Sequence, residues 1–232
     1  MDVDGALTPA GATLVVAAHP DDDVLGCGGT IARLAQVGHR VVLSFATDGV
    51  GARGSDRAAA QRRRDAARAA AAVLGVEDLR FGGWPDNQLD MVPLLSLSQH
   101  VEALIAEISP RLVLTHHPGD LNVDHRMMCQ AAATACRPQP GHPVRDLWSF
   151  EVASSTEWQV PGGQRAAFTP NLFVDISTTF SQKIRALETY ADEARPWPHA
   201  RSTEAVTALA RWRGATAGVD AAEAFMVQRM MR

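Results

Sequence analysis

The sequence has few cysteines, no long apolar run and no excess of basic residues. Its cysteines, Cys27, Cys129 and Cys136, are odd in number and form no C-x-x-C pair, which favours reduced thiols over a disulfide framework or a thiolate zinc site. No apolar stretch approaches the ~20 residues that span a bilayer. Residues 1–4 carry acidic groups where a secretory signal carries basic ones, so we expect a cytoplasmic protein without a membrane partner.

The charge balance is slightly acidic, with 22 basic against 26 acidic side chains and a net charge of −4. This composition provides no general electrostatic footprint for nucleic acid, and we expect no nucleic-acid partner. Apolar residues make up 46% and charged residues 21% of the chain, as in soluble globular proteins. No internal repeat or linker divides the 232 residues, so residues 1–232 are predicted to form a single domain. Formation of a homo-oligomer stays open.

Short apolar runs rich in β-branched residues alternate with helical patterns over the first 136 residues. This alternation predicts an α/β fold: a doubly wound, mostly parallel, Rossmann-like sheet with helices on both faces. The pattern loosens after Arg137, which indicates an elaborated C-terminal third. The predicted strands are 13–18, 40–46, 79–81, 111–115, 147–152 and 172–176, and the predicted helices are 24–37, 56–74, 94–108, 124–136, 181–191 and 202–211.

The first polar motif, His19-Pro20-Asp21-Asp22-Asp23, directly follows the first predicted strand. Three consecutive carboxylates repel one another unless a helix N-terminus or a cation offsets their charge. Helix capping alone would account for the aspartates, because aspartate is a favoured cap. The histidine three residues before Asp22 adds a nitrogen donor to the oxygen donors, and zinc accepts both kinds.

The second polar motif runs from Thr115 to Arg126 and follows the fourth predicted strand. In the common strand order 3-2-1-4, the first and fourth strands are neighbours, and ligands bind in the crevice between their carboxyl ends. Both motifs would then face the same crevice. A lone histidine more often has a structural role, but two runs of histidine and aspartate that meet at one crevice favour a metal site.

These motifs resemble the PIG-L/LmbE family of zinc-dependent N-acetylglucosaminyl deacetylases. The specific part of the resemblance is His19-Pro20-Asp21-Asp22 together with Asp124-His125-Arg126; the weaker matches are Thr47–Gly51, Leu74–Val76, Pro85–Asn87 and Pro198–Ser202. The resemblance implies an enzyme that removes the acetyl group from an N-acetylated amino sugar or its conjugate, a small-molecule substrate, and releases acetate and a free amine.

The resemblance also implies the roles of the central residues. One Zn²⁺ per chain would be held by His19, Asp22 and His125, with Asp21 as general base beside the water on the metal. Three protein ligands leave a position for this water, and the cation lowers its pKa to roughly 7. The ligand types do not distinguish Zn²⁺ from Fe²⁺.

This chain departs from the family at two positions. Asp23 stands where many relatives have glutamate, and Asn122 stands where some relatives have a histidine. Asparagine donates a hydrogen bond but cannot exchange a proton. Either Asp21 therefore acts as base and then as acid, or His117 or His199 protonates the departing amine.

Further polar residues follow the ends of the predicted strands. We expect Asp120 and Asp124 to orient a metal ligand or its loop, because a ligating imidazole usually donates its other N–H to a carboxylate or carbonyl. Arg62 and Arg63 begin a helix and face either the crevice or solvent. The residues expected to contact the substrate are Arg53, Asp86, Asn87, His117 and Asn122.

Three other functions are weaker interpretations of the same residues. The glycine-rich run Gly26–Gly29 is typical of dinucleotide binding, but three aspartates would oppose the phosphate charge and the glycines lie too far into the helix. A Mg²⁺-dependent phosphoryl transferase leaves His19 and His125 unexplained, because Mg²⁺ prefers oxygen ligands. A non-catalytic carbohydrate-binding or regulatory protein of this fold is expected to lack Asp21 or a metal ligand, and all of these residues are present.

Overall fold

The computed structural model describes residues 11–51, 57–160 and 166–231. Arg53, one of the predicted substrate-binding residues, lies outside these ranges. The elements of the fold, in chain order, are β1 (Ala12–Ala17), α2 (Asp22–Gln36), β2 (Val41–Thr47), α3 (Arg57–Leu74), β3 (Asp78–Trp84), the 3-10 helix η2 (Leu89–Met91), α4 (Leu94–Ile108), β4 (Pro110–His116), α5 (Val123–Ala135), β5 (Asp146–Phe150), β6 (Leu172–Asp175), α6 (Phe180–Glu188), the 3-10 helix η3 (Ala191–Glu193), α7 (Thr203–Ala217) and β7 (Ala222–Arg229).

A seven-stranded sheet with the order β3-β2-β1-β4-β5-β7-β6 forms the centre of the molecule. The first five of these strands are parallel, whereas β7 runs antiparallel to both β5 and β6. The predicted doubly wound α/β fold, with the first and fourth strands as neighbours, is therefore confirmed. Because β6 and β7 extend the same sheet, we propose that the whole chain forms one domain.

The last strand, β7, was not predicted from the sequence. The prediction ended with a helix over 202–211, which in the structure is α7 and stops at Gly218 in the left-handed conformation. The segment Ala222–Arg229 has alanine and glutamate in its first half, a composition that helices favour. Pairing with β5 on one side and β6 on the other makes it a strand, so tertiary contacts override the local preference.

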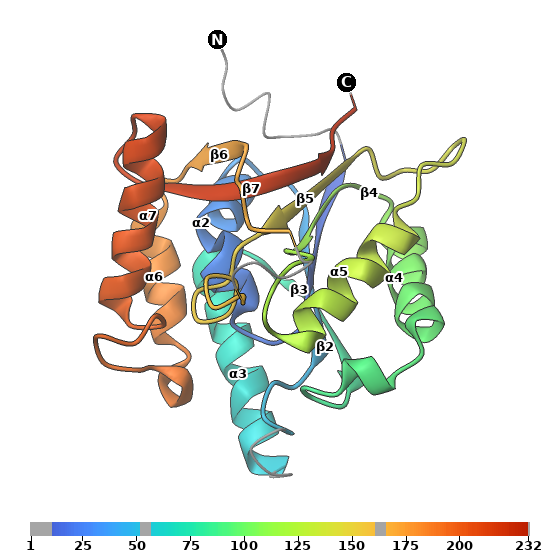
Figure 1. Cartoon of the computed structure of the whole chain (residues 1–232), viewed down its shortest axis with the longest axis horizontal. Coiled ribbons are helices and arrows are strands. Elements are labelled where there is room, and N and C mark those ends of the chain that lie inside the picture. Colours follow the sequence, from blue (N-terminus) through green and yellow to red (C-terminus); the bar gives the residue numbers. More distant parts are fainter. Residues whose placement is uncertain (1–10, 52–56, 161–165, 232) are drawn as a thin grey trace.

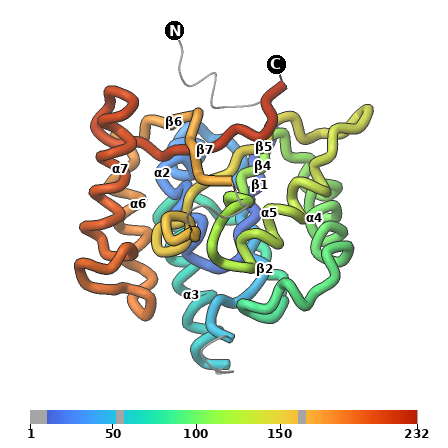
Figure 2. Tube along the Cα trace, viewed as in Figure 1, coloured from blue at the N-terminus to red at the C-terminus, as the bar shows by residue number. Residues whose placement is uncertain are grey.

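Two helical layers cover the sheet (Figures 1 and 2). Helices α2, α3, α6 and α7 pack on one face, and α4 and α5 pack on the other. Successive strand residues point to opposite faces, so in β1 Val15 and Ala17 join the first layer while Leu14 and Val16 join the second. No helix in the described part of the chain is long and apolar enough to cross a membrane.

Helix α2 lies unusually close to the sheet because of its glycines. A Cβ atom on Gly26 would lie 2.3 Å from the ring of Phe150, and one on Gly29 would lie 2.8 Å from Ile176. Both distances are too short for a side chain. The glycine-rich run therefore serves helix packing, which places the first turn of α2 directly over the ends of the central strands.

We expect the three cysteines to be unreactive in the folded protein. All are buried, and burial raises the pKa of Cys129 to about 11, that of Cys136 to about 12 and that of Cys27 well above its usual value. Since the thiolate is the nucleophile, a chromogenic disulfide reagent at pH 8 should give no rapid reaction with native protein and three equivalents after unfolding in denaturant. Rapid stoichiometric labelling of native protein would contradict the burial of these thiols.

Candidate metal centre

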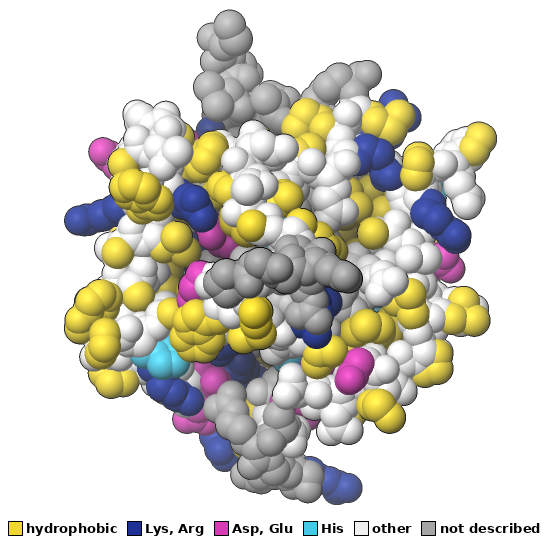
Figure 3. All heavy atoms as spheres, viewed as in Figure 1, with side chains coloured by type: hydrophobic (Ala, Val, Ile, Leu, Met, Phe, Trp, Pro, Cys, Tyr) yellow, Lys and Arg dark blue, Asp and Glu magenta, His cyan; other side chains and the backbone are white. Residues whose placement is uncertain are grey.

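The two polar motifs meet at the carboxyl ends of β1 and β4. These strands pair in parallel, so the loop after β1, with His19, and the loop after β4, which leads to His125 in the first turn of α5, lie at the same edge of the sheet. Asp22 lies between them in the first turn of α2. All three side chains are buried, and histidine occupies little of the molecular face seen in Figure 3.

Three atoms of these side chains form a nearly regular triangle. The distance from His19 Nδ1 to Asp22 Oδ2 is 3.0 Å, that from His125 Nε2 to Asp22 Oδ2 is 3.3 Å, and that from His125 Nε2 to His19 Nδ1 is 3.3 Å. Ligand atoms about 2.0–2.1 Å from a tetrahedral ion are separated by about 3.3–3.4 Å. The triangle thus has the size expected for three ligand atoms around a zinc-sized ion.

A second group of possible ligands shares His19. Its Nε2 atom lies 3.1 Å from Asp124 Oδ2 and 3.2 Å from Asp86 Oδ1, and these three residues also lie close enough to hold an ion. However, a neutral imidazole that offers Nδ1 to a metal carries its proton on Nε2. Asp86 and Asp124 are therefore placed to accept a hydrogen bond from this N–H group. Such a hydrogen bond orients a ligating histidine.

His125 has the corresponding arrangement. Its Nε2 faces the triangle while its Nδ1 lies 3.2 Å from Asp120 Oδ1. Asp120 in turn accepts hydrogen bonds from the hydroxyls of Ser155 and Thr156 in the loop after β5. Asp124 therefore contacts His19, and Asp120 contacts His125, as expected for carboxylates that orient ligating imidazoles.

Asp124 ties a further loop to the centre. Its two carboxylate oxygens accept the backbone N–H of Asn87 at 2.7 Å and that of Leu89 at 2.9 Å. The loop after β3 is thereby fixed against the first turn of α5. Loops that follow β1, β3, β4 and β5 all converge on the triangle.

The electrostatics of the centre favour a cation. Burial opposes the charge on His19, but Asp22, followed by hydrogen bonds to Asp124, Asp22 and Asp86, raises its pKa well above the usual value. Burial likewise opposes the charge on Asp22, yet His125 and His19 hold the pKa of this carboxyl well below its usual range. Oδ2 of Asp22, the oxygen of the triangle, also accepts the backbone N–H of His19 at 2.8 Å, which fixes its direction.

The pair of His125 and Asp120 shows the same pattern. Burial works against the charge on His125, whereas Asp22 and Asp120 raise its pKa to about 9. Burial also disfavours the charged form of Asp120, but hydrogen bonding to His125 and its charge lower the pKa of Asp120 well below the usual value. The buried carboxylates of Asp22, Asp86, Asp120 and Asp124 thus surround the imidazoles of His19 and His125. A divalent ion would offset the excess negative charge.

His116 was not singled out from the sequence. Its ring stacks on that of His125 with the centroids 4.0 Å apart, and its Nε2 accepts the backbone N–H of Ala18 at 2.8 Å. Burial, followed by the charge of His125, lowers the pKa of His116 well below its usual value. His116 is thus a neutral residue that packs against His125; only its position at the end of β4 could have indicated this.

Asp21 directly precedes Asp22 and has a strained conformation. Its φ of 110° is in the left-handed region, which costs a non-glycine residue on the order of 1–3 kcal/mol. Oδ2 is held by Arg63 at 2.8 Å and by Arg201 at 3.1 Å, while the buried Oδ1 has no hydrogen-bond partner in the part of the chain described.

Arg63 and Arg201 are thus brought to Asp21 from distant parts of the chain. Arg63 also pairs with Glu193 at 2.7 Å and is buried, unlike the neighbouring Arg62, which is exposed and pairs with Asp192. Sequence reasoning left the orientation of Arg63 open. Arg201 belongs to the segment 198–202 that carried a weak part of the resemblance, which was the only signal of its position.

Asp23 completes the aspartate run. It is buried, and the backbone N–H groups of Val24 and Asp21 offset only part of the cost of its charge. Burial, reinforced by the charges of Asp21 and Asp22, raises the pKa of Asp23 to about 7. The run is therefore more than a helix cap, because each of its aspartates has a different environment.

The residues expected to contact substrate are placed as follows. Asp86 is buried against His19, and Asn87 is an exposed turn residue with a φ of 55°. Asn122 caps α5 by accepting the backbone N–H of Asp124. His117 Nε2 lies 2.8 Å from the carbonyl oxygen of Ala166. Substrate contacts of these four residues stay predictions.

Comparison with known proteins identifies the family. The sequence model of the family PIG-L, GlcNAc-PI de-N-acetylase, matches residues 14–136, more than half of the chain. The chain belongs to the PIG-L family. The match begins in β1 and ends after α5, so it includes all three residues of the triangle and Asp21. The resemblance inferred from the motifs is therefore confirmed.

Several curated proteins are similar to this PIG-L family chain. A probable N-acetyl-alpha-D-glucosaminyl L-malate deacetylase 2 of Bacillus cereus is 26% identical over 86% of this chain and 92% of the relative. The diacetylchitobiose deacetylase of Thermococcus kodakarensis is 27% identical over 78% of this chain and 69% of the relative. A 4-oxalmesaconate hydratase of Pseudomonas putida is 28% identical over 83% and 78%, respectively.

Solved structures show the same fold. N,N'-diacetylchitobiose deacetylase from Pyrococcus horikoshii superposes with a TM-score of 0.77 at 21% identity and covers 99% of this chain and 88% of that one. A conserved protein of Thermus thermophilus has a TM-score of 0.76 at 28% identity and covers 96% of each chain. The PIG-L family chain thus has the fold of these proteins over nearly its full length.

We expect Asp120→Asn to weaken metal binding by about 10- to 100-fold, because removing the carboxylate that orients a ligating histidine has this effect in other metal sites. Competition with a chromophoric zinc chelator measures the affinity. Asp65→Asn is the matched control, since Asp65 is 61% exposed on α3 and its partners among the described residues are the exposed Arg68 and Gln61. An Asp120→Asn protein that is folded and binds zinc as tightly as the control would contradict this role of Asp120.

Proposed function

We propose that this PIG-L family chain is a metal-dependent hydrolase that removes the acetyl group from an N-acetylated amino sugar or its conjugate, giving acetate and a free amine. The observation that carries the proposal is the buried triangle of His19, Asp22 and His125, with the buried Asp21 directly preceding Asp22 in the chain. The names of two relatives, an N-acetylglucosaminyl malate deacetylase and a diacetylchitobiose deacetylase, support the choice of reaction and substrate class.

The donor set suits Zn²⁺, and Fe²⁺ accepts the same ligands. We assign one ion per chain to His19, Asp22 and His125. When bound, the ion would polarise the acetamide carbonyl and lower the pKa of the attacking water to roughly 7. The chain itself fixes the direction of the two imidazole donors through Asp86, Asp120 and Asp124.

Asp21 is assigned as the general base. Its Oδ1 has no hydrogen-bond partner in the described structure and takes the proton of the attacking water, while Oδ2 stays in contact with Arg63 and Arg201. These two contacts fix the carboxylate without occupying the oxygen that acts. A fixed base of this kind typically contributes about 10²–10⁴ to a rate.

Asp21 also returns the proton to the departing nitrogen in this proposal. Two histidines are the alternatives for this step, and one ring nitrogen of each has a backbone partner. His117 Nε2 contacts the carbonyl of Ala166, and His199 Nδ1 accepts the backbone N–H of Arg201. Asn122 uses its side-chain oxygen to cap α5. Its amide N–H₂ group is the part that would donate to a substrate oxygen.

A hydratase is the second candidate, because one relative at 28% identity has that name. A hydratase adds water to a double bond instead of cleaving an amide, and the same base and metal would activate the water. The buried site alone does not separate the two reactions, so the assay must offer both kinds of substrate.

Metal analysis together with an acetate-release screen tests the function. We expect about one equivalent of zinc or iron, acetate release from at least one member of a panel of N-acetylated amino sugars and conjugates, loss of activity with chelator, and recovery with added metal. Full activity in metal-free protein would overturn the metal assignment. Hydration of 4-oxalmesaconate, the substrate in the name of that relative, without acetate release would favour the hydratase.

Asp21→Asn should lower kcat by about 10²–10⁴-fold and leave the metal content unchanged, because an amide cannot accept the proton but keeps the shape of the side chain. Steady-state acetate release and metal analysis on the same preparation provide the measurement. Asp192→Asn, a neutralisation of the exposed partner of Arg62, is the control. Activity of Asp21→Asn equal to that of the control would remove Asp21 from the base role.

A further inference from the structure

Helix α2, which carries the metal ligand Asp22, is broken in its middle. Cys27 has a φ of −146° and a ψ of 21°, outside the helical region. The break separates a short first segment, residues 22–26, from a second segment, residues 28–36. A five-residue helical segment has no stability of its own, because helices shorter than about 12–15 residues are marginal in water. Contacts with the rest of the molecule must therefore fix its direction.

The backbone groups at the break have partners from elsewhere in the chain. In a regular helix the N–H of Gly29 donates to the carbonyl of Leu25. Here the N–H of Gly29 donates to Glu223 Oε1 at 2.8 Å, and the carbonyl of Leu25 accepts Lys183 Nζ at 2.8 Å. The N–H and the hydroxyl of Thr30 also donate to Glu223 Oε2, at 2.7 and 2.6 Å.

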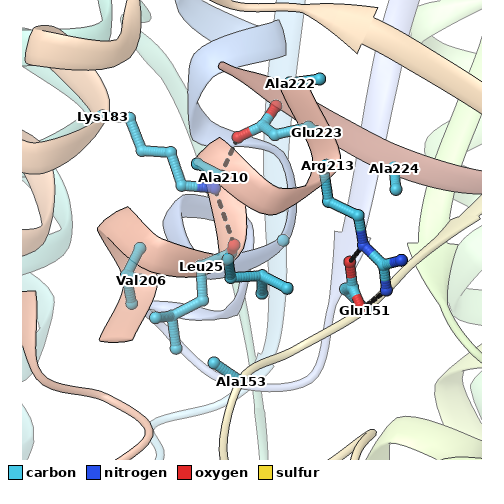
Figure 4. Close-up of a pocket in the computed structure, with 12 residues that line it drawn as sticks. Leu25, Glu151, Ala153, Lys183, Val206, Ala210, Arg213, Ala222, Glu223 and Ala224 are labelled. Atoms are coloured by element: carbon cyan, nitrogen blue, oxygen red, sulfur yellow. Dashed lines mark hydrogen bonds and ion pairs between the residues drawn. The ribbon is translucent and has the colours of Figure 1, made fainter. Parts of the chain in front are cut away.

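Glu223 and Lys183 are themselves an ion pair at 2.6 Å, with side chains only 3% and 4% exposed. Figure 4 shows the Lys183 amine between the Glu223 carboxylate and the Leu25 carbonyl. The carboxylate caps the N-terminus of the second segment and the ammonium caps the C-terminus of the first. Both charges have the sign that complements a helix end.

The cavity beside this pair is too small for a ligand. Its volume is about 10 Å³, which is room for one water molecule at most. A second ion pair, Glu151 with Arg213 at 2.7 and 2.8 Å, lines the same cavity, and Figure 4 shows it apart from Lys183 and Glu223. The two buried charges of Lys183 and Glu223 therefore serve α2 and not a bound molecule.

We propose that Glu223 and Lys183 are positioning residues of the metal centre: by capping both ends of the break in α2, they fix the short segment that carries Asp22 and follows Asp21. Glu223 lies on β7 and Lys183 on α6, both outside the residues 14–136 that match the family. The C-terminal third thus contributes to the site without supplying a ligand. This inference rests on the metal-dependent function proposed above.

Cobalt binding tests the proposal without any substrate. Glu223→Gln keeps the size of the side chain but removes the charge, and Lys183→Met removes the ammonium. We expect each variant to bind Co²⁺ at least about tenfold more weakly than wild type and to alter the visible absorption of the bound Co²⁺, because Asp22 is displaced. Where acetate release is observed, kcat should fall by a similar factor with little change in KM.

Two controls separate positioning from general stability. Glu151→Gln breaks the neighbouring ion pair of the same cavity, and Val101→Ala removes core volume beneath α4 on the other face of the sheet. Both should lower the thermal stability of the metal-free protein yet leave Co²⁺ affinity and absorption unchanged. If Glu223→Gln binds Co²⁺ with wild-type affinity and absorption, or shifts them no more than a control of equal thermal stability, the pair is only structural.

A milder variant covers the case in which the first two do not fold. Thr30→Val removes only the hydroxyl bond to Glu223, and we expect a smaller change of Co²⁺ absorption in the same direction; an unchanged spectrum then overturns the proposal. Failure of the proposed reaction has a different signature, since wild type would bind Co²⁺ and release no acetate. Wild type that binds no Co²⁺ would overturn both proposals.

Discussion

Negative charge buried at the edge of the sheet is the constraint on which this structure depends. Asp22, Asp86, Asp120 and Asp124 are buried around two imidazoles, and carboxylates removed from water are costly unless positive charge or hydrogen bonds offset them. The chain supplies hydroxyl and backbone N–H donors to Asp120 and Asp124, whereas Oδ2 of Asp22 faces the two imidazole nitrogens of the triangle, where a bound cation would offset its charge. A metal centre is the simplest way in which this arrangement becomes stable.

The two nitrogens of each imidazole explain why the site is assembled from several loops. Each histidine offers one nitrogen to the triangle and the other to a carboxylate, and each of those carboxylates anchors a further loop. His125 is thereby connected through Asp120 to the loop after β5, and His19 through Asp124 to the loop after β3. A change in any of these loops would be transmitted to a ligand atom, because the partners share hydrogen bonds.

Charged side chains hold the backbone at two irregular places. Asp21 keeps its left-handed conformation between Arg63 and Arg201, and the break of α2 at Cys27 lies between Lys183 and Glu223. In both cases the stabilising charges come from α3, α6, β7 or the loop before α7, far from the motif in the sequence. The C-terminal third, in which β7 was missed by prediction, therefore contributes to the geometry of the motif at the N-terminus.

The sequence by itself determined the fold class, the strand order around β1 and β4, and the motifs that contain the triangle, because alternating apolar patterns and short-range spacings such as that from His19 to Asp22 are local properties. It did not determine the strand β7, the supporting role of His116, or the partners of Asp21 and of the break in α2. Those features were decided only by tertiary structure, since the contacts join residues that are 40 positions apart in the pair of Lys183 and Glu223 and 180 apart in the pair of Asp21 and Arg201. No local pattern specifies which buried charges will meet.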